Sequence, residues 1–161
     1  MAVPKRRSTH LSPKGEARMV DVSAKQVTPR EARASARLVM SPETAEALRQ
    51  GDLAKGDALG TARIAGIMAA KRTHDLIPLC HPLSLTQIEV DLELGEDRVD
   101  IRTRVRTRDR TGVEMEALVA ASIAALTLYD MCKSIDRSMT VEALRLDSKS
   151  GGRSGDWERG G

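Results

Sequence analysis

Large aromatic side chains are almost absent from this sequence of 161 residues, which contains no Phe, one Tyr and one Trp. A hydrophobic core must therefore consist of Ala, Val, Ile, Leu and Met, and elements that bury such small side chains must pack closely or share surfaces between subunits. The same shortage argues against an RNA-binding module, because such modules stack bases on aromatic side chains of a sheet. Tyr129 and Trp157 both lie outside the strands that the sequence predicts.

A hydrophobic signal segment is also missing, and the first residues are charged instead. The longest apolar stretch, around 117–129, is interrupted by Ser122 and Thr127 and is too short to span a bilayer. The two cysteines, Cys80 and Cys132, are far apart in the sequence. We therefore expect a reduced, cytoplasmic protein that contacts no membrane.

The net charge of +3 comes from one end of the chain. The basic residues of segment 1–18 are Lys5, Arg6, Arg7, Lys14 and Arg18, opposed by Glu16 alone. Pro, Ser and Gly beside these charges indicate a solvated arm rather than a nucleic-acid contact. We predict a flexible basic arm at 1–18, a single domain that carries the chemistry at 19–156, and a C-terminal tail at 157–161, with no nucleic-acid partner.

The pattern of apolar residues predicts an α+β fold. Period-two alternation indicates strands at about 32–40, 83–94, 98–108 and 139–146. Helices are expected at 42–50, at 56–74 and from a capping box at Thr111 and Glu114 to about 135. Gly60 and Gly66 in the second helix favour close packing. The resulting order predicts a ferredoxin-like split β-α-β sandwich, an antiparallel sheet with an additional helix.

A loop fixed by two prolines is the first candidate site. Between Pro78 and Pro82 it presents a thiol, Cys80, beside an imidazole, His81. The alternatives are a rigid connection with a hydrogen-bonded His, a Cys-His catalytic pair, and a zinc site completed by Cys132. The last two are less favoured, because adjacent residues seldom point at one another and a fourth zinc ligand is missing.

The second candidate lies on the last predicted helix. Asp130 and Lys133 are spaced i, i+3 and share one face of a helix that is otherwise apolar, so they form either a plain ion pair or an acid-base site. Glu116, at the start of the same helix, lies roughly 21 Å from Asp130 along the helix axis. One compact site in one subunit cannot use both, so either their roles differ or a symmetric oligomer joins opposite helix ends.

The third candidate is the glycine-rich segment 149–156, which carries Lys149 and Arg153. Glycines let backbone N–H groups approach an anion, and the two cations supply charge. The segment is not a Walker A loop, and its composition also suits a flexible tail.

These segments together resemble the molybdenum cofactor biosynthesis protein C family, the cyclic pyranopterin monophosphate synthases. The matching stretches follow one another in family order between Gly15 and Asp156: Met19-Val20-Asp21-Val22-Ser23, Lys55-Gly56-Asp57, Thr61-Ala62-Arg63-Ile64-Ala65-Gly66, Asp75-Leu76-Ile77-Pro78-Leu79-Cys80-His81-Pro82-Leu83, Thr111-Gly112-Val113-Glu114-Met115-Glu116-Ala117-Leu118, Tyr129-Asp130-Met131-Cys132-Lys133 and 149–156. Gly60 and Ser84 depart from the pattern at positions with no expected catalytic role.

The resemblance implies a lyase that converts (8S)-3′,8-cyclo-7,8-dihydroguanosine 5′-triphosphate into cyclic pyranopterin monophosphate and pyrophosphate. It implies a homohexamer, a trimer of dimers, with sites at dimer interfaces. Lys55, Lys133 and Asp130 would be catalytic. The residues implied to contact the substrate are Leu79, Cys80, His81, Glu114, Met115 and Glu116 around the base, and Arg30, Lys149 and Arg153 at the phosphates.

No protein metal site or required cofactor is predicted, and a Mg²⁺ ion accompanying the triphosphate is left open. The expected partners are a small purine triphosphate and further copies of the chain. A non-catalytic nucleotide-binding oligomer of the same fold is the main alternative, because a fold alone does not determine function.

Overall fold

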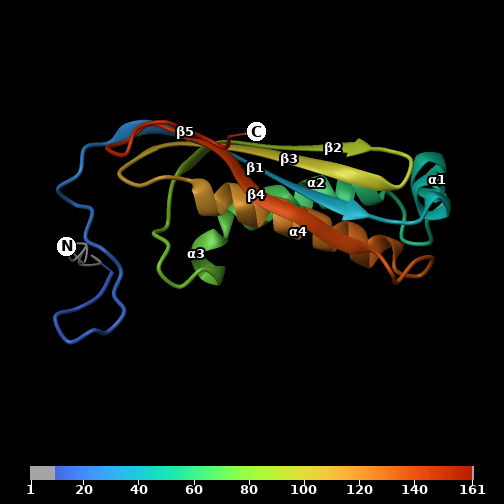
Figure 1. Cartoon of the computed structure of the whole chain (residues 1–161), viewed down its shortest axis with the longest axis horizontal. Helices are drawn as coiled ribbons and strands as arrows, with labels where there is room; N and C mark the ends of the chain where they lie inside the picture. The colour runs from blue at the N-terminus through green and yellow to red at the C-terminus, as the bar shows by residue number, and fades with distance from the viewer. Residues whose placement is uncertain (1–9, 161) are drawn as a thin grey trace, which may run out of the picture.

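An antiparallel sheet of five strands forms one layer of the protein, and two long helices form the other (Figure 1). The computed structural model describes residues 10–160. In chain order the elements are β1 (Thr28–Val39), α1 (Pro42–Gln50), α2 (Ala58–Lys71), α3 (Thr73–Leu76), β2 (Leu85–Leu94), β3 (Arg98–Asp109), α4 (Glu114–Cys132), β4 (Thr140–Ser150) and β5 (Trp157–Glu158). Helices α2 and α4 lie side by side on one face of the sheet.

The strand order is β2-β3-β1-β4-β5, and each neighbouring pair is antiparallel. Helices connect β1 to β2 and β3 to β4, which is the arrangement of the ferredoxin-like split β-α-β fold. The predicted α+β class and antiparallel sheet are confirmed. The additional helical elements are α1 and the short α3.

Alternation along β3 separates the core from the opposite face of the sheet. Val99 and Val105 are fully buried on the side of the helices. The arginines that alternate with this buried face point to the other side of the sheet, where Arg104 and Arg106 lie 3.1 Å and 2.5 Å from the carboxylate of Glu31. The period-two pattern therefore predicted both faces.

Alanine and glycine let α4 pack closely against α2. A Cβ atom on Gly66 would lie 3.0 Å from the carbonyl oxygen of Ala120 and 3.2 Å from a methyl group of Val90. The predicted close packing is confirmed at Gly66. It is wrong for Gly60, which lies in the first turn of α2, where a Cβ would collide with the Asp57 carboxylate that caps this helix.

Two helix boundaries differ from the prediction. The helix expected at 56–74 is interrupted at Arg72, and α3 follows as a separate turn. The capping box is wrong, because Val113 occupies the N-cap position of α4 and makes no side-chain cap. Val113 is fully buried, so the chain enters the core before the helix begins and Thr111 stays outside it. The carboxylate of Glu114 is thereby available for another role.

The C-terminal segment has more structure than predicted. β4 continues to Ser150, and β5 pairs with it at Lys149 and Ser148. The segment expected as a tail, 157–161, therefore contains a strand. Of the glycine-rich segment 149–156, the first two residues end β4 and the rest form the turn that leads to β5. Trp157 lies in that strand, contrary to expectation, with the Arg159 guanidinium 5.7 Å from its ring centroid.

The pairing of β1 with β4 is irregular. Its register shifts between Arg33 and Ala34 and again between Ser35 and Arg37. Ala143 in β4 has a φ of 51°, a left-handed conformation that costs energy for a residue with a Cβ. Such bulges bend a strand and increase its twist.

Part of the predicted N-terminal arm is described by the structure. Leu11 and Ala17 pair as an isolated bridge, and the N–H of Arg18 donates to the carbonyl of His10 at 2.9 Å. Residues 10–18 therefore form a closed turn, while the rest of the predicted arm lies outside the described residues.

Helix α4 is long and apolar enough to cross a membrane by length and composition, and it is the one such helix among residues 10–160. The sequence analysis considered only the apolar stretch around 117–129 and judged it too short to span a bilayer, whereas the whole helix has 19 residues. The helix packs against both α2 and the sheet, and 56% of its apolar window is buried inside the protein. Core helices of soluble proteins have the same property, so the finding is weak evidence for a membrane.

Candidate functional site

The loop between Pro78 and Pro82 lines a cavity of about 330 Å³ at the N-terminal end of α4. Leu79, Cys80 and His81 form one wall, and Nε2 of His81 lies 2.7 Å from the carbonyl oxygen of Val20. Burial, followed by the charges of Glu116 and Glu114, raises the pKa of the Cys80 thiol. Cys80 is therefore a neutral wall of this cavity, which we call the inner cavity, and not an activated nucleophile.

The first turn of α4 forms the opposite wall of the inner cavity. Glu114, Met115 and Glu116 all line it. Glu116 is only 4% exposed, and burial raises the pKa of its carboxyl to about 7, with a further increase from the charge of Glu114. Near neutral pH the protonated carboxyl can therefore donate a hydrogen bond to a polar ring, and the ionised carboxylate can accept one from it.

A second cavity of about 210 Å³ adjoins the first and is strongly polar; we call it the basic cavity. Arg30 lines it, with its guanidinium positioned by the carbonyl oxygens of Asp109 at 3.1 Å and Arg110 at 3.0 Å. Lys149 reaches it from β4 and donates to Ser154. Two cations from different strands thus converge on one space, as anion binding requires.

The glycine-rich turn gives the basic cavity its shape. Gly151 has a φ of 86°, and a Cβ there would overlap the carbonyl oxygen of Pro29. A Cβ on Gly152 would overlap the Arg30 guanidinium. Arg153 lies in the same turn but is not among the residues that line the basic cavity.

Lys55, Asp130 and Lys133 meet at the other end of α4. Asp130 accepts from Lys55 at 2.7 Å through one carboxylate oxygen and from Lys133 at 2.7 Å through the other. The hydrogen bonds from Lys133 and Lys55 lower the pKa of Asp130 to about 2. All three side chains are exposed, so this cluster is a surface feature of the single chain and not part of either cavity.

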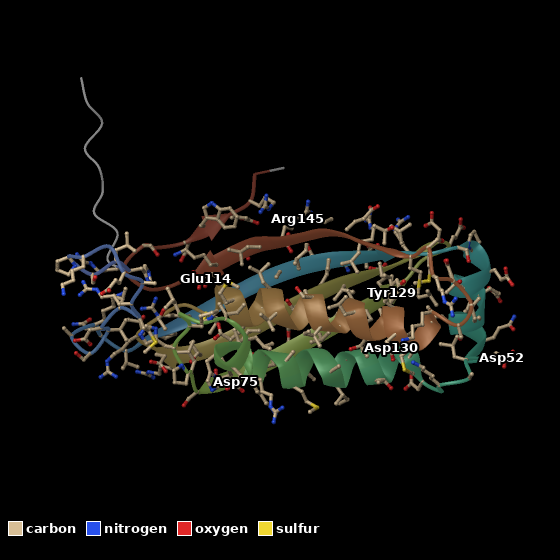
Figure 2. All side chains as sticks on the ribbon, turned by 90° about the horizontal axis from the view of Figure 1, so that it is seen from below. Asp52, Asp75, Glu114, Tyr129, Asp130 and Arg145 are labelled. Atoms are coloured by element: carbon tan, nitrogen blue, oxygen red, sulfur yellow. The ribbon has the colours of Figure 1, made fainter. Side chains whose placement is uncertain are left out.

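The candidate residues therefore form two groups and not one site. Figure 2 shows Glu114 and Asp130 at opposite ends of α4. Glu116 and Asp130 are roughly 21 Å apart along the axis at the standard helical rise. Each chain carries a group at the cavities and a second group at the lysine cluster, and these groups do not meet within it.

No metal site is found within the described part of the chain, where no group of three or more His, Cys, Asp and Glu residues is suitably placed. Within residues 10–160, Cys80, His81 and Cys132 do not form such a group. Cys132 is fully buried, and burial together with the charge of Asp136 raises the pKa of its thiol to about 11.

Sequence reasoning missed several residues at the two cavities. Lys25, Thr111 and Gly112 line both of them, and Arg110 lines the basic cavity. Thr111 and Gly112 were recognised only as a family motif and a helix start. Lys25 follows the Met19–Ser23 motif, which had no assigned role. Its place depends on a contact between distant segments, because Arg110 Nε donates to the Lys25 carbonyl at 3.1 Å.

Known proteins resemble this chain over nearly its whole length. A relative from Streptomyces coelicolor, named cyclic pyranopterin monophosphate synthase, is 57% identical over 97% of this chain and 92% of its own. One from Mycobacterium tuberculosis, named cyclic pyranopterin monophosphate synthase 3, is 60% identical over 94% and 86%. One from Roseiflexus sp., also named cyclic pyranopterin monophosphate synthase, is 62% identical over 92% and 96%.

The sequence model of the MoaC family matches residues 19–152. That range contains nearly all the stretches on which the resemblance rested, from the Met19–Ser23 motif to the glycine-rich turn. The resemblance is confirmed, and this chain belongs to the MoaC family.

Proposed function

We propose that this protein is a cyclic pyranopterin monophosphate synthase. It is a lyase that converts (8S)-3′,8-cyclo-7,8-dihydroguanosine 5′-triphosphate into cyclic pyranopterin monophosphate and pyrophosphate in molybdenum cofactor biosynthesis. The observation that carries the proposal is the cluster in which Asp130 holds the ammonium groups of Lys55 and Lys133 at 2.7 Å each. These residues stand at the positions that the resemblance implied to be catalytic, and the relatives bear the name of this enzyme.

The inner cavity suits the purine-derived ring. Leu79 and Met115 offer apolar contact to its faces, while His81 and Glu116 offer polar atoms to its edge. Because the pKa of Glu116 is raised to about 7, this side chain can match a ring whose own protonation changes during the rearrangement.

The basic cavity suits the triphosphate. Arg30 presents a positioned guanidinium, and Lys149 adds an ammonium group from the neighbouring strand. Together they offset the charge of a polyanion and fix its direction away from the ring. Arg153 remains a predicted phosphate contact that a partner chain would bring into reach.

The lysine cluster supplies proton transfers. Rebuilding a purine as a pterin requires protons to be removed and returned at several atoms, and an amine can do both. Asp130, ionised at all moderate pH values, orients the two ammonium groups and keeps them close despite their like charge.

Two copies of the chain are required to bring these groups together. We propose a dimer in which α2 and α4 of one subunit face those of the next in opposite directions, within a homohexamer built as a trimer of dimers. Ile64 and Met68 on α2 and Leu126 on α4 are 58%, 54% and 54% exposed, which gives this helix pair an apolar surface between the two groups. A two-fold axis there would place one subunit's lysine cluster beside the other's cavities.

We further propose a cytoplasmic enzyme that takes up Mg²⁺ only as a complex with the triphosphate. Within residues 10–160 the donor set fits no protein-held divalent ion, whereas phosphate oxygens are good Mg²⁺ ligands. In this proposal the ion neutralises phosphate charge, and Arg30 and Lys149 bind the remaining oxygens.

Turnover tests the proposal. Purified protein is incubated with the cyclised dihydro-GTP substrate, and pyrophosphate and the oxidised fluorescent pterin are measured. We expect both products from the wild type and a large loss in Lys55→Ala and Lys133→Ala, with Lys14→Ala, an exposed lysine outside both groups, as the control. Substrate binding without either product would support the non-catalytic alternative instead.

A further inference from the structure

We infer that Asp136 is a positioning residue for Lys55 and Lys133, a role that rests on the proposed function. Asp136 lies in the loop between α4 and β4, shortly after Lys133, and its side chain is buried. Within residues 10–160, the partners found for its carboxylate are Ser41 and Ser138, and neither lysine is among them. Asp136 therefore acts on the two amines through the backbone segments that carry them.

The Asp136 carboxylate bridges two distant parts of the chain. One oxygen accepts from the N–H of Ser41 at 2.9 Å, and the other accepts from the N–H of Ser138 at 2.8 Å and from its hydroxyl at 2.6 Å. The hydrogen bonds from the Ser138 hydroxyl and from the N–H groups of Ser41 and Ser138 lower the pKa of this carboxyl. The group is thus an anion at neutral pH, and hydrogen bonds to an anion are stronger than those between neutral groups.

The first of the two segments carries Lys133. This residue is the C-cap of α4, and the Cys132 carbonyl just before it accepts from the N–H of Asp136 at 3.2 Å. The chain therefore turns back directly after Lys133, and Asp136 ends that turn. The Tyr129 hydroxyl donates to the Arg137 carbonyl at 3.0 Å, which attaches the far side of the turn to α4.

The second segment carries Lys55. Ser41 is the N-cap of α1, and its hydroxyl accepts from the N–H of Thr44 at 3.2 Å, which leaves its own N–H for Asp136. Helix α1 ends at the Gly51 C-cap, and the loop from there to α2 contains Lys55. Figure 1 shows α1 at the same end of the molecule as the C-terminal end of α4. Asp136 thus ties the start of the helix that leads to Lys55 to the turn that follows Lys133.

The two amines depend on these segments because their own side chains are exposed. Asp130 holds both at 2.7 Å, but only where the two backbones bring them within its reach. Proton transfer requires a hydrogen-bond distance, and a displacement of about 1 Å can lower a rate on the order of 100-fold. By fixing one segment against the other, Asp136 keeps Lys55 and Lys133 at the separation that a shared substrate needs.

Asp136→Asn is the direct test. The amide has one acceptor oxygen and one NH₂ group, so it can accept from Ser41 or from Ser138 but presents a donor to the other. We expect kcat to fall at least about tenfold, with KM and the Kd of tripolyphosphate within about twofold of wild type, because the two cavities lie at the opposite end of α4. Calorimetry with tripolyphosphate counts the intact sites, and kcat is expressed per site, so unfolded chains do not lower it.

Two further variants separate positioning from stability. Ile101→Val removes one methyl group from a fully buried side chain of β3 and should lower the melting temperature without changing kcat per site. Ser138→Ala removes one of the three hydrogen bonds to Asp136 and leaves both N–H donors, so kcat per site should fall about threefold. Ser138→Ala decides the question if Asp136→Asn yields no folded oligomer.

The outcomes distinguish this role from the proposed function. Wild-type kcat per site in Asp136→Asn, an equal loss in Ile101→Val, or tripolyphosphate binding weakened as much as kcat would overturn the positioning role and leave the proposed function intact. Wild-type kcat per site in Ser138→Ala has the same meaning where Asp136→Asn does not fold. Absence of turnover in the wild type would instead overturn the proposed function, and the role of Asp136 with it.

Discussion

Lys55 donates to Asp130 twice, to the carboxylate at 2.7 Å and to the main-chain carbonyl at 2.9 Å. The second contact ties the lysine to the backbone of α4 near its C-terminal end, where carbonyl groups carry partial negative charge. Lys133 takes the other carboxylate oxygen at 2.7 Å. Two amines that would repel one another are thus held beside a single anion.

Asp130→Asn should therefore abolish most turnover while the fold is retained. The amide keeps the shape of the side chain but removes the charge that holds the two lysines, so we expect kcat to fall at least about 100-fold. Turnover assays and thermal unfolding check this together. The matched control is Asp75→Asn, which removes an exposed carboxylate whose one ion-pair partner among residues 10–160 is His74. Near-wild-type turnover in Asp130→Asn would remove this residue from the mechanism.

Mixed oligomers should recover activity that neither parent has. His81→Ala damages the inner cavity and Lys133→Ala damages the lysine cluster, and in the proposed dimer these positions of different chains form one site. Co-refolding the two inactive variants should then produce some sites that carry neither substitution. Native mass spectrometry verifies the mixing. Mixed oligomers without turnover would contradict a shared site.

Stability should fall as pH rises through the range in which Glu116 titrates. Its pKa is raised from 4.5 to about 7 in the folded protein, so between these values the folded state binds a proton that the unfolded state has lost. Unfolding is therefore favoured as pH increases from about 4.5 to about 7. Denaturant titrations at several pH values should show this slope in the wild type and a smaller one in Glu116→Gln. An unchanged slope would assign the effect to other groups.

Gly151→Ala should weaken triphosphate binding more than Gly155→Ala. Both glycines have a positive φ, 86° and 68°, so both substitutions cost backbone energy. At Gly151 the new Cβ would also overlap the Pro29 carbonyl, whereas nothing lies within 4 Å of a Cβ at Gly155. Calorimetry with tripolyphosphate should show a loss of roughly tenfold or more at Gly151 and a smaller one at Gly155. Equal losses of affinity in the two variants would mean that the backbone strain common to both, and not the overlap with the Pro29 carbonyl, weakens binding.

The sequence predicted the layers of the fold because alternation and helical periodicity record which face is buried. Along β3, buried valines alternate with arginines, and the close approach of α2 and α4 was visible in Gly66 and in the alanines of α4. The capping box at Thr111 was predicted wrongly because a local motif competed with the burial of Val113, which is a tertiary effect.

The site was predicted by residue type but not by location. Asp130 lies in the last turn of α4 and Lys133 at its C-cap, so their contact followed from the i, i+3 spacing. The predicted distance between Asp130 and Glu116 left two alternatives open, different roles for the two carboxylates or a site shared between subunits. Lys25 could not be placed at the two cavities in this way, because its position depends on a hydrogen bond to its carbonyl from Arg110, 85 positions away. A contact between two distant loop segments produces no periodic pattern of apolar residues, so the sequence alone does not predict it.

The irregular pairing of β4 affects how the open edge of this strand can interact with other molecules. Beyond the pairs that β5 makes with Ser148 and Lys149, the outer edge of β4 has no strand beside it within residues 10–160. A long flat edge of this kind invites strands of other molecules and, eventually, aggregation. The bulge at Ala143 and the charged pair of Arg145 and Asp147 interrupt that edge with a bend and with side chains that resist dehydration. These features oppose the pairing of this edge with strands of other molecules.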